Sequence, residues 1–195
     1  MDTLSVIAAR RSTPRLNPPG PSPADLEAIL IAAACAPDHC ELRPWRFVVL
    51  EGEHKDAFGA VMAEAYLARS TERPTDGQLD KERRKLDRAP LVLVVAAVHR
   101  DHDNVPFTEQ VCSAAAAAQN ALLAATALGY GSMWRTGDAA RDPAVAKVLG
   151  LGPADAVVAF LYLGTPPEDV VNEPRRSDLE ALVTRWHSRT DQLGT

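Results

Sequence analysis

The continuous apolar segments of the chain predict the strands of its sheet. Residues 91–98 (LVLVVAAV) and 156–163 (AVVAFLYL) are apolar throughout; Pro90 precedes the first segment and Gly164 follows the second. Such runs are typical of strands that are covered on both faces, because a strand with one solvated face shows alternating polar residues. Two shorter strands are expected over residues 45–50 and 132–135.

Helices are expected between these strands from their apolar periodicity and their end signals. Ser22 is a good N-cap, Pro23 takes the first helical position and Asp25 follows, so a helix should run from here to about Ala36. The longest helix signal, residues 107–128, would be about 33 Å long at 1.5 Å per residue. Its run of consecutive alanines permits close packing, which places this helix at the centre of the molecule or in a subunit interface. Shorter helices are expected over residues 2–11, 54–69, 79–88 and 143–149.

The order of these elements predicts one α+β domain that spans residues 1–195. The strands are too few and too scattered for a long doubly wound sheet, and the chain shows no internal repeat or interdomain linker. Residues 70–78 are expected to form a loop, and residues 70–88 together could act as a modest lid. Residues 167–195 form a C-terminal tail, in which a last helix is expected from Ser177 with Glu180 completing a capping box.

The overall charge limits the classes of partner. The chain has a formal net charge of −5 and a pI near 5.5. A broad basic face is therefore not expected, which argues against nucleic acid and anionic membranes as partners. An anionic ligand would need a local cluster of basic side chains.

Targeting signals and cysteine usage indicate a cytoplasmic protein. The first residues, MDTLSVIAAR, include an early acid and only a short apolar stretch, unlike a signal peptide. Residues 111–129 are largely apolar but consist mostly of alanine with several polar residues, which favours a buried helix over a membrane span. Three cysteines, an odd number without a secretion signal, predict reduced thiols: Cys35, Cys40 and Cys112.

Arg10, Arg11 and Ser12 follow the first predicted helix and allow two interpretations. Arginines at a helix C-terminus complement the helix dipole. Alternatively, two guanidinium groups and a hydroxyl form a phosphate-binding group, because a guanidinium pairs with phosphate through two parallel hydrogen bonds. Both interpretations remain open from the sequence.

The segment CAPDHCELRPWRF, residues 35–47, contains side chains of several chemical types. Cys35, Asp38, His39 and Cys40 are metal-ligand types, but they are crowded together and no second cluster elsewhere completes a tetrahedral site, so no metal is expected. His39 could act as a general acid or base, donate a hydrogen bond to a ligand, or cap a loop.

Two segments combine an aromatic ring with a cation. Arg43, Pro44 and Trp45 stand together at the start of a predicted strand, and Trp134 and Arg135 lie within GSMWRTG. Such pairs suit stacking on a flat ligand together with a charged donor, although a core tryptophan beside a surface arginine gives the same pattern. The dinucleotide-binding G-x-G-x-x-G, the P-loop, the G-x-S-x-G elbow and HExxH are all absent from the sequence.

Taken in order, these motifs resemble the nitroreductase family, most closely its small, single-domain NAD(P)H nitroreductases. The resemblance rests on an early RRS, then APDH and PWRF, an Ala-rich helix, GSMWRTG and FLYLGTP, and it covers roughly residues 4–167. It implies a nitroreductase-like α+β fold, with a central, mostly antiparallel sheet flanked by helices. It also implies an interlocked homodimer with two FMN molecules at the subunit interface, each touching both chains.

The resemblance also implies which residues hold the cofactor. Arg10, Arg11 and Ser12 match the family's phosphate and ribityl contacts, and Arg175 and Arg176 lie in the tail, where other members place a phosphate-binding arginine. These assignments agree with the chemistry, because the phosphate of FMN is close to a dianion at neutral pH.

Further contacts are implied around the flavin ring. His39 matches a flavin-contacting position, the Pro44–Trp45 step matches the part near the ring, and Cys35 stands where close relatives carry a basic side chain. The later flavin-binding segment corresponds to Trp134, Arg135 and Thr136.

The function implied by the resemblance is hydride transfer from NADH or NADPH through FMN to a small acceptor, such as a nitro compound or a quinone, in a ping-pong reaction. No catalytic residue is required beyond the flavin, although His39 could donate a hydrogen bond. The alternatives are a dehalogenating or ring-modifying flavoenzyme, and a protein that stores or senses flavin without turnover.

Overall fold

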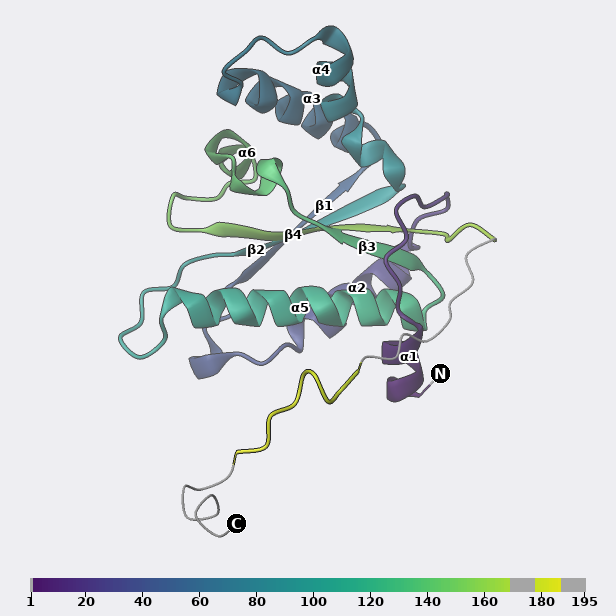
Figure 1. Ribbon diagram of the computed structural model, residues 1–195, viewed down its shortest axis with the longest axis vertical. Coiled ribbons are helices and arrows are strands. Elements are labelled where there is room, and N and C mark those ends of the chain that lie inside the picture. The colour runs from purple at the N-terminus through teal and green to yellow at the C-terminus, as the bar shows by residue number, and fades with distance from the viewer. Residues whose placement is uncertain (1, 169–177, 187–195) are drawn as a thin grey trace.

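The computed structural model of the chain describes residues 2–168 and 178–186. Its centre is a four-stranded antiparallel sheet in the order β1-β2-β4-β3, which lies between two layers of helices (Figure 1). The strands are β1 (Trp45–Glu51), β2 (Leu91–Ala97), β3 (Gly131–Arg135) and β4 (Ala156–Gly164). The α-helices are α1 (Thr3–Ala9), α2 (Pro23–Ala34), α3 (Gly52–Arg69), α4 (Asp76–Arg83), α5 (Phe107–Ala127) and α6 (Pro143–Val148). Short 3-10 turns form η1 (His39–Glu41), η2 (Lys85–Arg88) and η3 (Asp138–Arg141).

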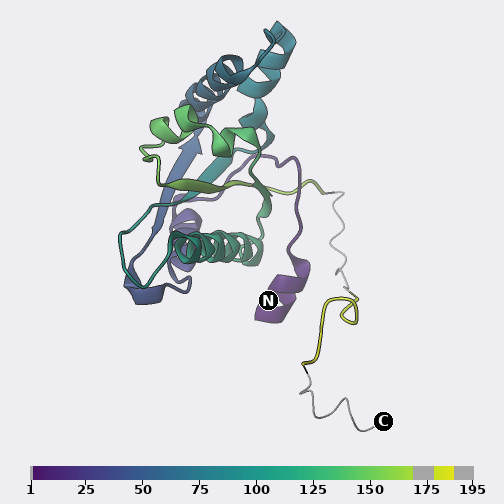
Figure 2. The same cartoon turned by 60° about the vertical axis from the view of Figure 1, so that its left-hand side comes forward.

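Both faces of the central strands are covered, as their continuous apolar sequences predict. Every residue of β2 is buried. Alternate side chains of β2 point to opposite faces: Val92 and Val94 pack in the core under α3 and η2, whereas Leu91 and Leu93 pack against α2 and α5. In the turned view of Figure 2, α2 and α5 lie side by side on one face of the sheet and α3, α4 and α6 lie on the other.

The small side chains of α5 let this helix approach the sheet closely. Ala114, Ala117 and Ala118 have no exposed surface and pack against residues of β2 and β4. The helix is therefore at the centre of the chain's own core, which is one of the two positions expected for it. Among the described residues, no helix combines the length and the apolar character required to cross a bilayer.

Most expected elements are confirmed within a few residues of their predicted ends. The Ser22 side chain accepts a hydrogen bond from the Asp25 amide and caps α2, although this helix ends at Ala34 rather than Ala36. The three cysteines are free and exposed.

Two expectations about charged segments were wrong. Residues 79–88 do not form one helix: α4 begins at Asp76, because Thr75 and Gln78 form a capping box, and a separate 3-10 turn, η2, follows it. The C-terminal helix is also absent from residues 178–186, which contain only a turn. Its expected start, Ser177, lies outside the described residues.

The segment before α2 is tied to the far end of the chain. Ser12 forms an isolated parallel bridge with Ser132 of β3, and the Thr13 amide donates to the Ser132 carbonyl oxygen at 2.9 Å. Asn17 and Thr165 exchange two backbone hydrogen bonds of 2.7 and 2.8 Å. The N-terminal segment therefore lies alongside the ends of β3 and β4.

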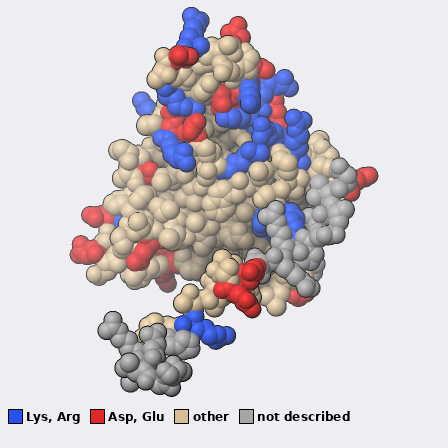
Figure 3. Space-filling view, in the orientation of Figure 1, with Lys and Arg blue, Asp and Glu red and all other residues tan. Residues whose placement is uncertain are grey.

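Charged side chains are distributed unevenly on the molecule. On the face seen in Figure 3, lysines and arginines gather over the layer that contains α3, α4 and η2, and a broad uncharged area lies below them. A local basic cluster therefore exists on this acidic chain, as an anionic ligand would require.

Candidate functional site

Arg10, Arg11 and Ser12 line one cavity of about 400 Å³ beside the apolar side chains of α1. The cavity adjoins β3, because Ser12 bridges to Ser132. Among the described residues, the Arg10 side chain has no carboxylate within salt-bridge distance. The three residues are thus brought together on one surface, with cationic and hydroxyl donors facing a hollow large enough for a phosphate.

The hydrogen bonding of the Arg11 guanidinium agrees with both interpretations of this segment, helix capping and phosphate binding. Its Nη1 donates to the carbonyl oxygens of Ala8, at 2.7 Å, and Arg10, at 2.8 Å, so it satisfies the C-terminal end of α1. Its Nη2 is buried and has no hydrogen-bond partner among the described residues. A buried unpaired donor is costly, and a bound anion would remove that cost. One side of the group is therefore structural, and the other is a hydrogen-bond donor without a partner among the described residues.

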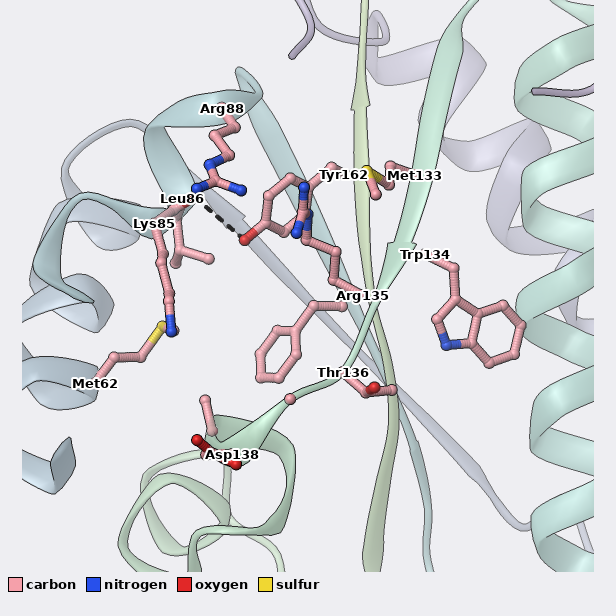
Figure 4. Close-up of a pocket in the computed structure, with 13 residues that line it drawn as sticks. Met62, Lys85, Leu86, Arg88, Met133, Trp134, Arg135, Thr136, Asp138 and Tyr162 are labelled. Carbon is pink, nitrogen blue, oxygen red and sulfur yellow. Dashed lines mark hydrogen bonds between the residues drawn. The ribbon is translucent and has the colours of Figure 1, made fainter. Parts of the chain in front are cut away.

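The second candidate segment lies at the carboxyl end of β3. The Trp134 and Arg135 side chains point to opposite sides of the strand, Trp134 toward α5 and Arg135 toward Tyr162 (Figure 4). The Arg135 guanidinium carbon lies 5.8 Å from the centre of the Tyr162 ring, and the buried Arg135 Nε has no hydrogen-bond partner in the described part of the chain. Trp134, Arg135 and Thr136 also line a pocket of about 290 Å³ between η2, β3 and β4.

Tyr162 adds a neutral phenol to the lining of this pocket. Burial raises the pKa of the Tyr162 phenol above its ordinary value, while the nearby charges of Arg135 and Arg88 oppose the rise. The phenol therefore stays protonated at neutral pH, and its hydroxyl donates to the Lys85 carbonyl oxygen at 3.3 Å.

His39 lies in a constrained loop against the start of α5. Its Nδ1 is 2.9 Å from a carboxylate oxygen of Glu109. The His39 side chain is 57% exposed and the Glu109 side chain is 50% exposed. The loop after it has left-handed backbone at Cys40, Glu41 and Arg43, a conformation that is uncommon for residues other than glycine. The His39 imidazole is thus held in one orientation with its other ring nitrogen unpaired among the described residues.

The remaining predicted contacts are distant from β3 within one chain. Trp45 opens β1, which is the opposite edge strand of the sheet, and about 14 Å separates two strands that lie three places apart. Pro44 immediately precedes Trp45, and Cys35 is an exposed residue at the end of α2. One chain therefore carries two separate groups of candidate residues, one beside β3 and one around η1.

Two other predictions from the sequence concern the arginines of the tail and the binding of metal ions. Arg175 and Arg176 lie outside the described residues. Within the described part of the chain, no three His, Cys, Asp or Glu side chains gather to hold a metal ion.

Besides Trp134, Arg135 and Thr136, the pocket beside β3 is lined by residues that the sequence did not single out, among them Lys85, Arg88 and Tyr162. Lys85 and Arg88 belong to a charged segment that resembled a solvated helix face, and Tyr162 belongs to a strand that resembled core. Only the density of basic residues between positions 81 and 88 could have indicated an anion site. The segment that could act as a lid, residues 70–88, therefore lies in two places: α4 packs on α3, whereas η2 borders the pocket.

Comparison with known proteins identifies the family. A sequence model of the Nitroreductase family matches residues 7–165. The "Putative NAD(P)H nitroreductase YdjA" of Escherichia coli K12 is 40% identical over 166 residues, which cover 85% of this chain and 89% of the relative.

Solved structures share the fold over almost the whole length. A nitroreductase-like family protein from Bacillus cereus has a TM-score of 0.80 at 21% identity, covering 96% of this chain and 97% of that one. A nitroreductase with bound FMN from Desulfitobacterium hafniense has a TM-score of 0.66 at 25% identity, covering 96% of this chain and 100% of that one. With its antiparallel sheet between two helical layers and its matching sequence, this chain belongs to the nitroreductase family.

Proposed function

We propose that this protein is an FMN-dependent oxidoreductase, which takes hydride from NADH or NADPH and reduces a small acceptor such as a nitro compound or a quinone. FMN, when bound, supplies the redox chemistry by accepting hydride from one substrate and returning it to the other. The names of the E. coli relative and the bound FMN of the D. hafniense structure support this proposal.

The observation that carries the proposal is the donor set of the cavity beside α1. Arg10, Arg11 and Ser12 line one cavity, and the buried Arg11 Nη2 has no hydrogen-bond partner among the described residues. A phosphate monoester fits this set, because it accepts several charge-assisted hydrogen bonds at once. The residues present therefore fit the phosphate of FMN.

We assign the ring of the cofactor to the carboxyl end of β3. Ser12 and Ser132 are adjacent, so the phosphate-binding residues and Trp134 to Thr136 belong to neighbouring segments. Because the Trp134 and Arg135 side chains point to opposite sides of the strand, Arg135 would offer a cation to the polar edge of the ring, while Trp134 packs toward α5. The two substrates would then use the same open face in turn, which is the basis of ping-pong kinetics.

We further propose that a second chain supplies His39, together with Pro44, Trp45 and Cys35, to complete each site. Within one chain these residues lie apart from β3, and a homodimer would bring the η1 region of one subunit to β3 of the other. Glu109 would hold the His39 ring through Nδ1, leaving Nε2 for a hydrogen bond to the cofactor or acceptor.

Flavin content tests this proposal. The purified protein should be yellow, with about one FMN per chain. Arg10→Gln should weaken FMN binding by about 1.5–3 kcal/mol, the range for hydrogen bonds to charged groups. Arg73→Gln is the matched control, because Arg73 is exposed on the loop before α4. A protein that stays colourless after reconstitution, or equal FMN affinity in both variants, would refute the assignment.

Reduction kinetics separate an enzyme from a flavin store. Mixing the yellow protein with NADPH or NADH should bleach the flavin absorbance within seconds, and addition of a quinone should restore it. Reduction over hours would instead support storage or sensing.

A further inference from the structure

A second basic surface lies next to the pocket beside β3. An open groove of about 510 Å³ adjoins the pocket, and we call it the η2 groove after the turn that borders both. Lys85 and Arg88 line the pocket and the groove alike. The groove also includes Arg15, Lys81 and Arg84, together with the carboxylates of Asp80 and Asp87. The two cavities therefore form one extended basic surface, which lies in the region where Figure 3 shows lysines and arginines gathered.

Part of this charge is neutralised within the protein. Arg84 pairs with Asp87 at 3.1 Å and with Asp80 at 4.0 Å, and Lys85 pairs with Glu82 at 2.5 Å. These pairs occupy two of the five basic side chains of the η2 groove.

The other basic side chains of the surface are free for a ligand. Among the described residues, Arg15, Lys81 and Arg88 have no carboxylate within salt-bridge distance. Arg135 faces Arg88 across the pocket, with Tyr162 between them (Figure 4). Arg135 lines the pocket, and its buried Nε has no hydrogen-bond partner among the described residues.

The shapes of the two cavities favour an extended ligand with several negative charges. The pocket, about 290 Å³, is at the small end of the range for ligand sites and suits one group of a larger molecule. The groove is larger and open, and free cations lie along both. A dinucleotide has this distribution of charge, since its phosphates are spaced along a flexible chain.

We propose that this surface binds the phosphates of the nicotinamide nucleotide and makes NADPH, rather than NADH, the preferred reductant. The inference rests on the proposed function, in which the cavity at Arg10 holds the FMN phosphate and leaves the η2 groove free. Arg88, which lines both cavities, binds the pyrophosphate common to both nucleotides. Arg15 and Lys81 bind the additional 2′-phosphate of NADPH, which is close to a dianion at neutral pH.

An equilibrium binding experiment tests the inference without turnover. The probes are 2′,5′-ADP and 5′-AMP, titrated calorimetrically into the purified full-length protein at low ionic strength. We expect 2′,5′-ADP to bind about ten-fold more tightly, a modest value for two charge-assisted contacts in a solvent-exposed groove. The double variant Arg15→Gln, Lys81→Gln should reduce this ratio to about two-fold or less. The control is Arg83→Gln, an exposed charge on α4 that does not line the groove.

Equal affinity for the two probes in the wild-type protein would overturn the inference, and so would a ratio that the double variant leaves unchanged. A protein that binds no FMN but still prefers 2′,5′-ADP would refute the proposed function and leave this site standing. The two failures are therefore distinguishable.

Arg88 gives a second, kinetic test. Arg88→Gln should raise the KM for NADPH and for NADH by a similar factor of about ten, with the flavin content unchanged. The double variant Arg15→Gln, Lys81→Gln should raise the KM for NADPH alone. Loss of FMN from Arg88→Gln would overturn the inference, because Arg88 would then hold the cofactor rather than the reductant.

Discussion

Gln110 joins α5 to the loop that precedes it, and its replacement tests how much this connection contributes to stability. The side chain is 1% exposed, although it is polar. Its Oε1 accepts from the Arg100 amide at 2.8 Å, and its Nε2 donates to the carbonyl oxygens of Arg100, at 2.8 Å, and Val105, at 3.1 Å. The two polar atoms of one side chain thus satisfy three backbone groups of residues 98–106.

Gln110→Leu keeps the approximate volume of the side chain and removes all three hydrogen bonds. Each bond contributes about 1 kcal/mol net, for a loss of about 3 kcal/mol, and burial of the apolar leucine offsets about 1 kcal/mol of it. We therefore expect the free energy of unfolding to fall by about 2 kcal/mol. The Arg100 amide should also exchange with solvent faster, because it loses its acceptor.

The assay is urea unfolding followed by circular dichroism, at one protein concentration for all variants because the stability of the proposed homodimer would depend on concentration. Gln119→Leu is the matched control: it makes the same change at an exposed position of α5 and should stay within about 0.5 kcal/mol of wild type. If Gln110→Leu is as stable as the control and the Arg100 amide stays protected, the three bonds do not anchor the loop and the reasoning fails.

Three further substitutions address the helices and the buried phenol. Gly59→Ala should destabilise the protein by about 1–3 kcal/mol in the same assay, because the added Cβ would overlap the Arg83 carbonyl oxygen and push α4 away from α3. The control is Gly77→Ala, whose added Cβ meets no neighbour, and it should be close to neutral. Ser22→Ala should cost about 1 kcal/mol through loss of the N-cap of α2, and an unchanged midpoint in thermal unfolding would contradict this. The raised pKa of Tyr162 contributes stability that is present below pH 10.0, the ordinary phenol value, and is lost as the pH rises toward the folded-state pKa. Tyr162→Phe should therefore flatten the fall in unfolding free energy above pH 10. Parallel curves of unfolding free energy against pH for the variant and the wild type would count against this.

Much of the fold follows from local sequence signals. The strands β2 and β4 are evident because burial on both faces leaves no polar position in their sequences, and α2 is evident because Ser22 and Pro23 mark its start. The ends of α4 were missed because the capping residue Thr75 lies in a segment whose composition is typical of a loop. The helix predicted in the C-terminal tail is absent from residues 178–186. A capping residue alone does not stabilise a helix, and the apolar side chains of these residues remain exposed rather than packed.

The candidate site was predictable only in part. Arg10, Arg11 and Ser12 stand together in the sequence, so their shared cavity needs no long-range information. Arg88 and Arg135 line one pocket only because the fold brings η2 and β3 together, and such proximity depends on strand order rather than on local pattern. For the same reason, the sequence could not show that Trp45 and Trp134 occupy opposite edges of the sheet.

The two backbone hydrogen bonds between Asn17 and Thr165 have a consequence for synthesis on the ribosome. Thr165 also bonds through its hydroxyl to the Pro19 carbonyl oxygen, 146 residues away. Arg10, Arg11 and Ser12 leave the ribosome well before Ser132 and Thr165, the residues to which their segment is bonded. A nascent chain must therefore carry this segment unattached until β3 and the end of β4 have been made, and cofactor capture follows the pairing of these strands.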